Sequence, residues 1–151
     1  MSEWAMFERY IDFSTRFPHE ILQNEQNYIS PEMGWAGTID RVIRMDGKLI
    51  LLDIKTSGSI WPAYWLQLAA YRQLLLQVGG ISVDAVAILH LNAKTRTEGK
   101  KGAVQGTGWQ LITRDDSTKD LQLFGITRQL WLTQHADDLP RQATYQLTHK
   151  R

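Results

Sequence analysis

The sequence predicts a mixed α/β fold in which a central β-sheet is flanked by helices. The chain has 151 residues, the size of one domain, and with 43% hydrophobic residues and six Trp it can bury a sizeable core. Short apolar runs rich in β-branched residues alternate with longer segments whose apolar residues recur every three to four positions. That alternation is typical of α/β proteins, so we expect residues 1–151 to form a single domain.

The N-terminal part predicts one helix followed by three strands. Residues 3–17 place aromatic and aliphatic side chains three to four positions apart, which indicates an amphipathic helix. Residues 25–30 are expected to form a short strand. Within residues 35–57, Asp46 and Gly47 separate two apolar runs, and this pair tolerates the positive φ of a two-residue turn. The sequence therefore predicts an antiparallel hairpin here.

The remainder of the chain predicts two more helices and two more strands. Pro62 suits the first turn of a helix, and Gly79 with Gly80 ends it. The elements expected in order are a helix over 62–79, a doubly buried strand over 83–92, a basic Gly-rich loop over 93–108, a strand over 109–114 paired with the one before the loop, and a closing helix over 118–139 with an apolar stripe.

Composition limits the classes of function. The chain has no cysteine, which excludes disulfides, Cys-ligated zinc and iron–sulfur clusters and fits an intracellular protein. A bound metal would therefore have oxygen or imidazole ligands, and oxygen ligands favour Mg²⁺ or Mn²⁺. The apolar runs are too short to span a membrane, and the N-terminus has no signal-peptide pattern. We expect no membrane partner.

Charge is unevenly distributed along the chain. Residues 1–60 hold six Lys and Arg against nine Asp and Glu, whereas residues 61–151 hold eleven against seven. An acidic half beside a basic half is compatible with a metal site next to a surface that binds a polyanion. Ordinary variation in composition explains the asymmetry equally well. The asymmetry therefore supports a functional interpretation only together with a specific site.

Two carboxylates lie at matching positions of the predicted hairpin. If the turn centres on residues 46 and 47, Asp40 on the first strand faces Asp53 on the second. Like charges at directly opposed positions destabilise a sheet unless a positive group lies between them. Lys55 follows Asp53 by two positions, so strand alternation places it on the same face.

This arrangement suggests a metal site with a neighbouring ammonium group. Asp40, Asp53 and the backbone carbonyl of Ile54 would bind a divalent cation, the kind of ion that activates water and polarises a phosphate. Lys55 would position or deprotonate the attacking water and neutralise developing charge. An isolated Asp-x-Lys at the end of a strand is more often only solvated, but the opposed Asp40 favours the functional interpretation.

Three short segments in order resemble a known enzyme family. They are "GTID" (37–40), "LLDIKTS" (51–57) and "QLAAY" (67–71). They resemble the G-x-x-D, D/E-x-K and Q-x-x-x-Y motifs of the PD-(D/E)XK nucleases, most closely of the RecB-like branch, which includes many phage exonucleases. The resemblance covers roughly residues 25–92.

The resemblance implies a restriction-endonuclease-like core and Mg²⁺- or Mn²⁺-dependent hydrolysis of DNA phosphodiesters. It further implies exonuclease action in DNA recombination, repair or processing, inside a bacterial or phage-infected cell. Gln67 and Tyr71 would border the catalytic site and help to place substrate; alternatively, Tyr71 packs the helix on the sheet and Gln67 is exposed. The family usually adds an upstream Glu or His ligand, for which Glu25 and Glu20 are the leading candidates.

Basic and aromatic residues near the predicted site could hold DNA. Lysine and arginine side chains of the loop over 93–108 would contact the phosphate backbone without reading sequence: Lys94, Arg96, Lys100 and Lys101. Thr56 and Ser57 directly follow Lys55, and the nearby Trp61 could stack on an unpaired base. A solvated basic loop with no ligand is the alternative for 93–108.

The sequence is compatible with two other functions. One is a structure-specific endonuclease of the junction-resolvase type, which would work as a homo-oligomer. The other is a DNA-binding module that keeps the nuclease fold with weak or no catalysis. The combination of Asp40, Asp53 and Lys55 favours the enzyme over the module.

Overall fold

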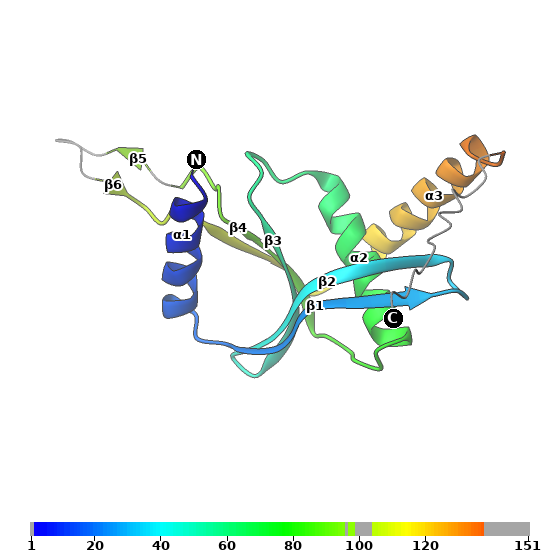
Figure 1. Cartoon of the computed structure of the whole chain (residues 1–151), viewed down its shortest axis with the longest axis horizontal. Coiled ribbons are helices and arrows are strands. Elements are labelled where there is room, and N and C mark those ends of the chain that lie inside the picture. The colour runs from blue at the N-terminus through cyan, green and yellow to red at the C-terminus, as the bar shows by residue number, and fades with distance from the viewer. Residues whose placement is uncertain (1, 96, 99–103, 138–151) are drawn as a thin grey trace, which may run out of the picture.

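The structure, a computed structural model, describes residues 2–95, 97–98 and 104–137, and it has the expected mixed α/β architecture (Figure 1). In chain order the elements are α1 (Glu3–Arg16), β1 (Glu20–Ser30), β2 (Trp35–Met45), β3 (Lys48–Lys55), α2 (Pro62–Gln77), β4 (Ala85–His90), β5 (Thr97–Glu98), β6 (Val104–Gln105), β7 (Gln110–Arg114) and α3 (Thr118–Gln134). None of the helices in this described part is long and apolar enough to cross a membrane.

The main sheet has five strands in the order β1-β2-β3-β4-β7. Strands β3 and β4 pair in parallel and are joined by α2, whereas the other neighbours are antiparallel. All six residues of β4 are buried. The prediction of a doubly buried strand there is confirmed, and so is its pairing with the strand after the loop.

The hairpin between β2 and β3 has the predicted turn. Asp46 and Gly47 adopt φ values of 49° and 78°, the left-handed conformation that a two-residue turn of this kind requires. From the turn, paired residues run from Met45 opposite Lys48 to Arg41 opposite Leu52. This is the predicted register, which would bring Asp40 opposite Asp53 at the next position.

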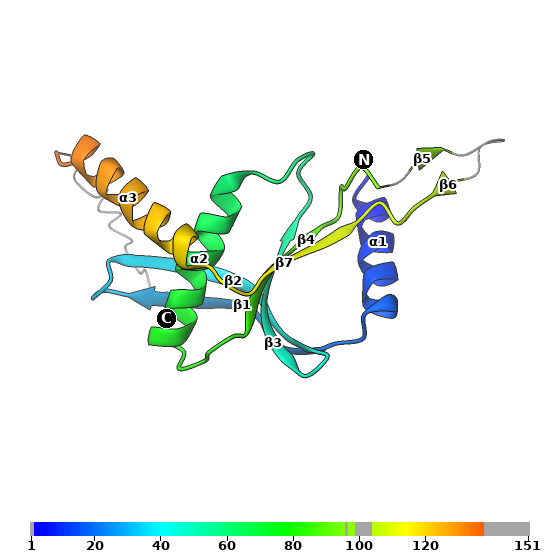
Figure 2. The ribbon, with the colours of Figure 1, turned by 180° about the vertical axis from the view of Figure 1, so that it is seen from behind.

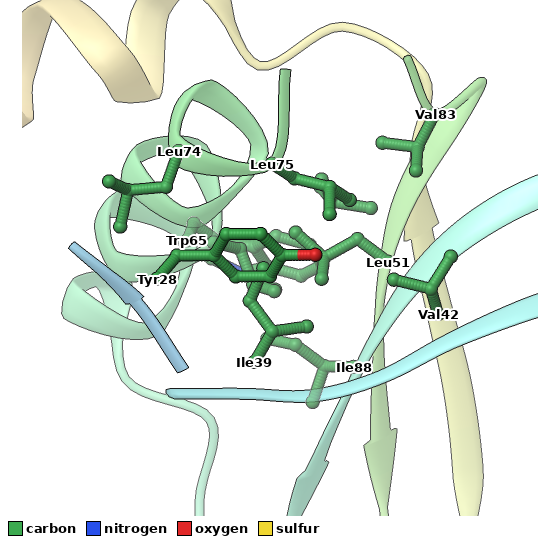
Figure 3. Close-up of a cluster of buried hydrophobic side chains, with 11 residues drawn as sticks. Tyr28, Ile39, Val42, Leu51, Trp65, Leu74, Leu75, Val83 and Ile88 are labelled. Atoms are coloured by element: carbon green, nitrogen blue, oxygen red, sulfur yellow. The ribbon is translucent and has the colours of Figure 1, made fainter. Parts of the chain in front are cut away.

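Helices cover both faces of the sheet. Figure 2 shows α1 on one side of the sheet, away from α2 and α3. On this face Phe13 of α1 packs with Ile43, Leu52 and Leu89. On the other face, α2 packs its apolar residues against Leu51 and neighbouring side chains. Figure 3 shows this second cluster of buried side chains between α2 and the strands. Because both faces of β3 are covered, its apolar run is continuous instead of alternating.

Several element boundaries differ from the prediction. Strand β1 begins at Glu20, five residues before the predicted start, and most of its side chains are exposed. It is an edge strand, so its polar residues gave no apolar pattern to recognise. The predicted loop over 93–108 contains the short β5–β6 pair, because two-residue strands leave no periodic signal. Helices α2 and α3 end at Gln77 and Gln134, earlier than expected.

The predicted final helix is present as α3, but its apolar residues do not form a buried face. None of its residues is fully buried, and several large apolar side chains are exposed: Leu123, Ile126, Leu130, Trp131 and Leu132. Helix α3 lies beside α2, with Phe124 packed edge-on against Trp35 at 5.2 Å between ring centroids (Figure 1). Since α2 already covers this face of the sheet, α3 reaches only the outer layer.

Candidate active site

Asp53 and Lys55 form an ion pair at the C-terminal end of β3. Asp53 is 3% exposed, and its Oδ2 lies 2.7 Å from Nζ of Lys55. This oxygen accepts no hydrogen bond of regular geometry, yet the short separation makes Lys55 its charge partner. The same-face placement expected from strand alternation therefore holds, and a charged pair stands where the apolar run of β3 ends.

Asp40 joins this pair from the neighbouring strand. Regular β2–β3 pairing stops at Arg41 and Leu52, and at the next position the Asp40 side chain accepts a hydrogen bond from the Ile54 N–H, with 3.0 Å between Oδ2 and N. The Asp40 carboxylate thus accepts a hydrogen bond that a backbone carbonyl of β2 would accept if the regular strand pairing continued. In an extended strand the N–H and C=O of one residue point to the same side, so the Ile54 carbonyl also faces β2.

The environment of Asp53 disfavours its charged form. Burial raises the pKa of Asp53 from its ordinary value of 3.8 to about 6; Lys55 opposes this rise, and the neighbouring Asp40 adds to it. A buried carboxylate with a raised pKa beside a second carboxylate is typical of sites that bind a cation or transfer a proton.

Helix α2 adds two further polar groups, Gln67 and Tyr71. The Gln67 Nε2 donates to the Tyr71 hydroxyl at 2.8 Å, and its Oε1 accepts from Lys55 Nζ at 3.3 Å. Because an ammonium group only donates, Lys55 fixes the Gln67 oxygen toward itself, and the amide nitrogen is left to donate to Tyr71. Tyr71 also packs against the core, as the packing alternative expected, whereas Gln67 is half-buried and not exposed as that alternative expected.

Gly37 makes room for this arrangement. A Cβ at Gly37 would lie 2.9 Å from Cδ1 and from Cζ of the Tyr71 ring, too close for real atoms. The absence of a side chain on β2 is thus what lets Tyr71 approach the sheet and hold Gln67. This contact gives a physical reason for a glycine three residues before Asp40.

Replacing Gly37 by alanine is expected to lower the free energy of unfolding by about 1–3 kcal/mol, because the added methyl group overpacks against Tyr71. Denaturant titration measures the change. The double variant Gly37→Ala with Tyr71→Leu should recover part of the stability lost by Gly37→Ala, since the smaller side chain relieves the clash. Additive losses in the double variant would contradict this explanation.

The donor set suits a hard divalent cation. Asp40 and Asp53 offer carboxylate oxygens, one of them buried without a regular hydrogen bond, and the Ile54 carbonyl faces the same side. Oxygen ligands of this kind fit Mg²⁺ or Mn²⁺. Within residues 2–95, 97–98 and 104–137, however, no group of three or more His, Cys, Asp or Glu side chains converges.

The two proposed additional acidic ligands lie at different distances from this set. Glu20 pairs with Arg44 at 3.2 Å, four residues along β2 from Asp40 and so about 13 Å away. Glu25 is nearer: it lies between the β1 residues paired with Arg41 and Ile39, next to Asp40 in the register. Glu25 is exposed and has a left-handed φ of 49°. Its backbone therefore lies beside Asp40, but its side chain is not buried with the two carboxylates.

Of the expected DNA-binding residues in the loop, Lys94 is exposed, whereas Arg96, Lys100 and Lys101 lie outside the described residues. The base of this loop is anchored to α1. The Arg9 Nη1 donates to the carbonyls of Leu91 and Gly108 at 2.7 and 2.8 Å, and Trp109 Nε1 donates to Asp12 at 2.7 Å. The first helix therefore holds both ends of the loop that follows β4.

The segment after Lys55 is held by a residue with no role in the sequence prediction. His90 pairs with Lys55 in the parallel β3–β4 register, and its Nε2 lies 2.7 Å from the Ser57 carbonyl. A carbonyl only accepts, so Nε2 carries the proton. Thr56 is exposed on this segment, and Trp61 at its end is 59% exposed, as a base-stacking residue would need.

Comparisons with known proteins do not assign a family. No protein-family model and no curated protein matches the chain. Among solved structures, the crystal structure of SSO0001 is similar over 94% of this chain and 70% of that chain, with 18% sequence identity and a TM-score of 0.40. That similarity is too low to support a conclusion about function.

Proposed function

We propose that the protein is a divalent-metal-dependent deoxyribonuclease with a PD-(D/E)XK core, most similar to RecB-like phage exonucleases. The observation that carries the proposal is the ion pair of the buried Asp53 with Lys55 beside Asp40. A buried acid with an adjacent acid and an ammonium group is costly for a fold to keep without a use. Its chemistry matches what phosphodiester hydrolysis requires.

Each group has a specific part in the proposed reaction. Asp40, Asp53 and the Ile54 carbonyl would hold Mg²⁺ or Mn²⁺, which supplies Lewis-acid polarisation of the phosphodiester and a lowered pKa for water. Lys55 places a positive charge beside the pentacovalent phosphate, where negative charge develops. Gln67, oriented by Tyr71, keeps the Lys55 ammonium in place. Exposed groups, including Trp61 and Lys94, would hold the DNA strand.

Cleavage assays with defined DNA substrates test the proposal. Linear double-stranded, single-stranded and four-way-junction DNA are incubated with Mg²⁺, Mn²⁺ or EDTA. We expect metal-dependent cleavage of linear DNA and a loss of activity in Asp40→Asn, with Asp46→Asn as the matched control because Asp46 is an exposed turn residue of the same hairpin. Mononucleotide products indicate an exonuclease, and paired internal cuts in junction DNA indicate the resolvase alternative.

A DNA-binding module with weak catalysis is the second candidate. The described residues bring together two carboxylates instead of three, which favours a site with lower metal affinity. Salt-dependent DNA binding by wild type in EDTA, with no cleavage of any substrate in Mg²⁺ or Mn²⁺, would support the module and exclude the enzyme.

A further inference from the structure

Tyr64 places its aromatic ring against the Lys55 ammonium group. Nζ lies 4.5 Å from the ring centroid, within the range of about 6 Å over which a cation is attracted to a ring face. Tyr64 belongs to none of the three segments that carry the nuclease resemblance. We infer that Tyr64 is a positioning residue that holds the Lys55 ammonium beside the carboxylate pair, through its ring and not its hydroxyl.

The need for such a residue follows from the chemistry of lysine. An ammonium group on a flexible four-carbon stem has no fixed geometry, so its position depends on its partners. Lys55 has a carboxylate oxygen of Asp53 at 2.7 Å and the amide oxygen of Gln67 at 3.3 Å. The ring is a third attractive group, and the Lys55 side chain is only 18% exposed, which strengthens the attraction.

The ring is itself held in position. Tyr64 is part-buried and packs against the apolar core between α2 and the sheet. Residues 64, 67 and 71 are spaced by three and four positions, so they share one face of α2. The helix therefore presents a ring, an amide and a phenol in a row, with Lys55 against the first two.

Two substitutions at Tyr64 separate the ring from the hydroxyl. Tyr64→Phe keeps the ring, whereas Tyr64→Leu keeps apolar packing without it; Phe7→Leu, an exposed position on α1, controls for loss of an aromatic residue. We expect Tyr64→Leu to lower kcat by about 10-fold with KM nearly unchanged, and Tyr64→Phe to stay within about 2-fold of wild type. If Tyr64→Leu does not fold, Tyr64→Met replaces it.

Because this inference rests on the proposed function, the test includes a measurement independent of cleavage. The rate of reductive methylation of Lys55, measured by mass spectrometry at fixed pH, should rise about 3-fold or more in Tyr64→Leu and stay unchanged in Tyr64→Phe. Equal kcat losses in both variants, or an unchanged methylation rate in Tyr64→Leu, overturn the inference. If wild type cleaves no DNA, the proposed function fails, and the methylation rates alone decide the role of Tyr64.

Discussion

Replacing Asp53 by asparagine is expected to abolish DNA cleavage and, at the same time, to stabilise the fold at pH 8 in the absence of metal. We expect a loss of cleavage rate of at least about 1000-fold, because the variant lacks a charged ligand at the centre of the site. We expect a gain in the free energy of unfolding of about 3 kcal/mol, which follows from the pKa of Asp53.

The sign of the stability effect follows from proton linkage. The folded-state pKa of Asp53 is raised from 3.8 to about 6, so between these values the folded state binds more protons than the unfolded state. Stability therefore falls as pH rises through this window and stays low above it. An asparagine is neutral at every pH. The variant should therefore exceed wild type in free energy of unfolding by the full amount at pH 8 and by very little at pH 4.

Urea denaturation in EDTA at pH 4 and at pH 8 measures this difference, with Asp46→Asn as the control for replacing an exposed carboxylate. Addition of Mg²⁺ at pH 8 should stabilise wild type but not Asp53→Asn, because only the wild type binds the ion with both carboxylates. An Asp53→Asn variant less stable than wild type at pH 8 would falsify the view that this carboxylate is retained for function at a cost to the fold.

Replacing Lys55 by methionine is expected to destabilise the protein and to lower cleavage by at least about 100-fold. Methionine preserves the length and packing of the side chain but removes the charge. Asp53 is then buried without a counter-charge, and breaking a buried pair in this way costs about 3 kcal/mol at pH 8. The stability effect should therefore depend on Asp53 being ionised.

A double-mutant cycle tests this dependence. In the Asp53→Asn background, Lys55→Met should cost less than about 1 kcal/mol, because no buried carboxylate remains to be compensated. Lys48→Met, an exposed lysine on the same strand, is the matched control and should change neither stability nor cleavage appreciably. An equal cost of Lys55→Met in both backgrounds would mean that its packing, and not its charge, stabilises the site.

Local chemistry explains which parts of the fold the sequence could predict. The Asp46–Gly47 turn sets the register of the hairpin by backbone conformation alone, and this register predicts that Asp40 faces Asp53. Apolar periodicity predicted α1, although Phe13 is its only buried apolar residue, and Pro62 with Gly79 and Gly80 predicted the approximate bounds of α2. Helix α3 is also present where it was predicted, but several of its large apolar residues are exposed, because spacing along the sequence predicts a helix and not what covers it.

The sequence by itself determined the hairpin, the shared face of Asp53 and Lys55, and the order of strands and helices, because turn geometry and strand alternation act over a few residues. Tertiary structure alone decided the contacts of Tyr64, Gly37 and His90, which depend on how α2 and β4 pack against the hairpin. It also decided that Glu20 lies away from the carboxylate pair while Glu25 lies next to Asp40. These are contacts between separate elements, and no local pattern specifies the distance between two packed elements.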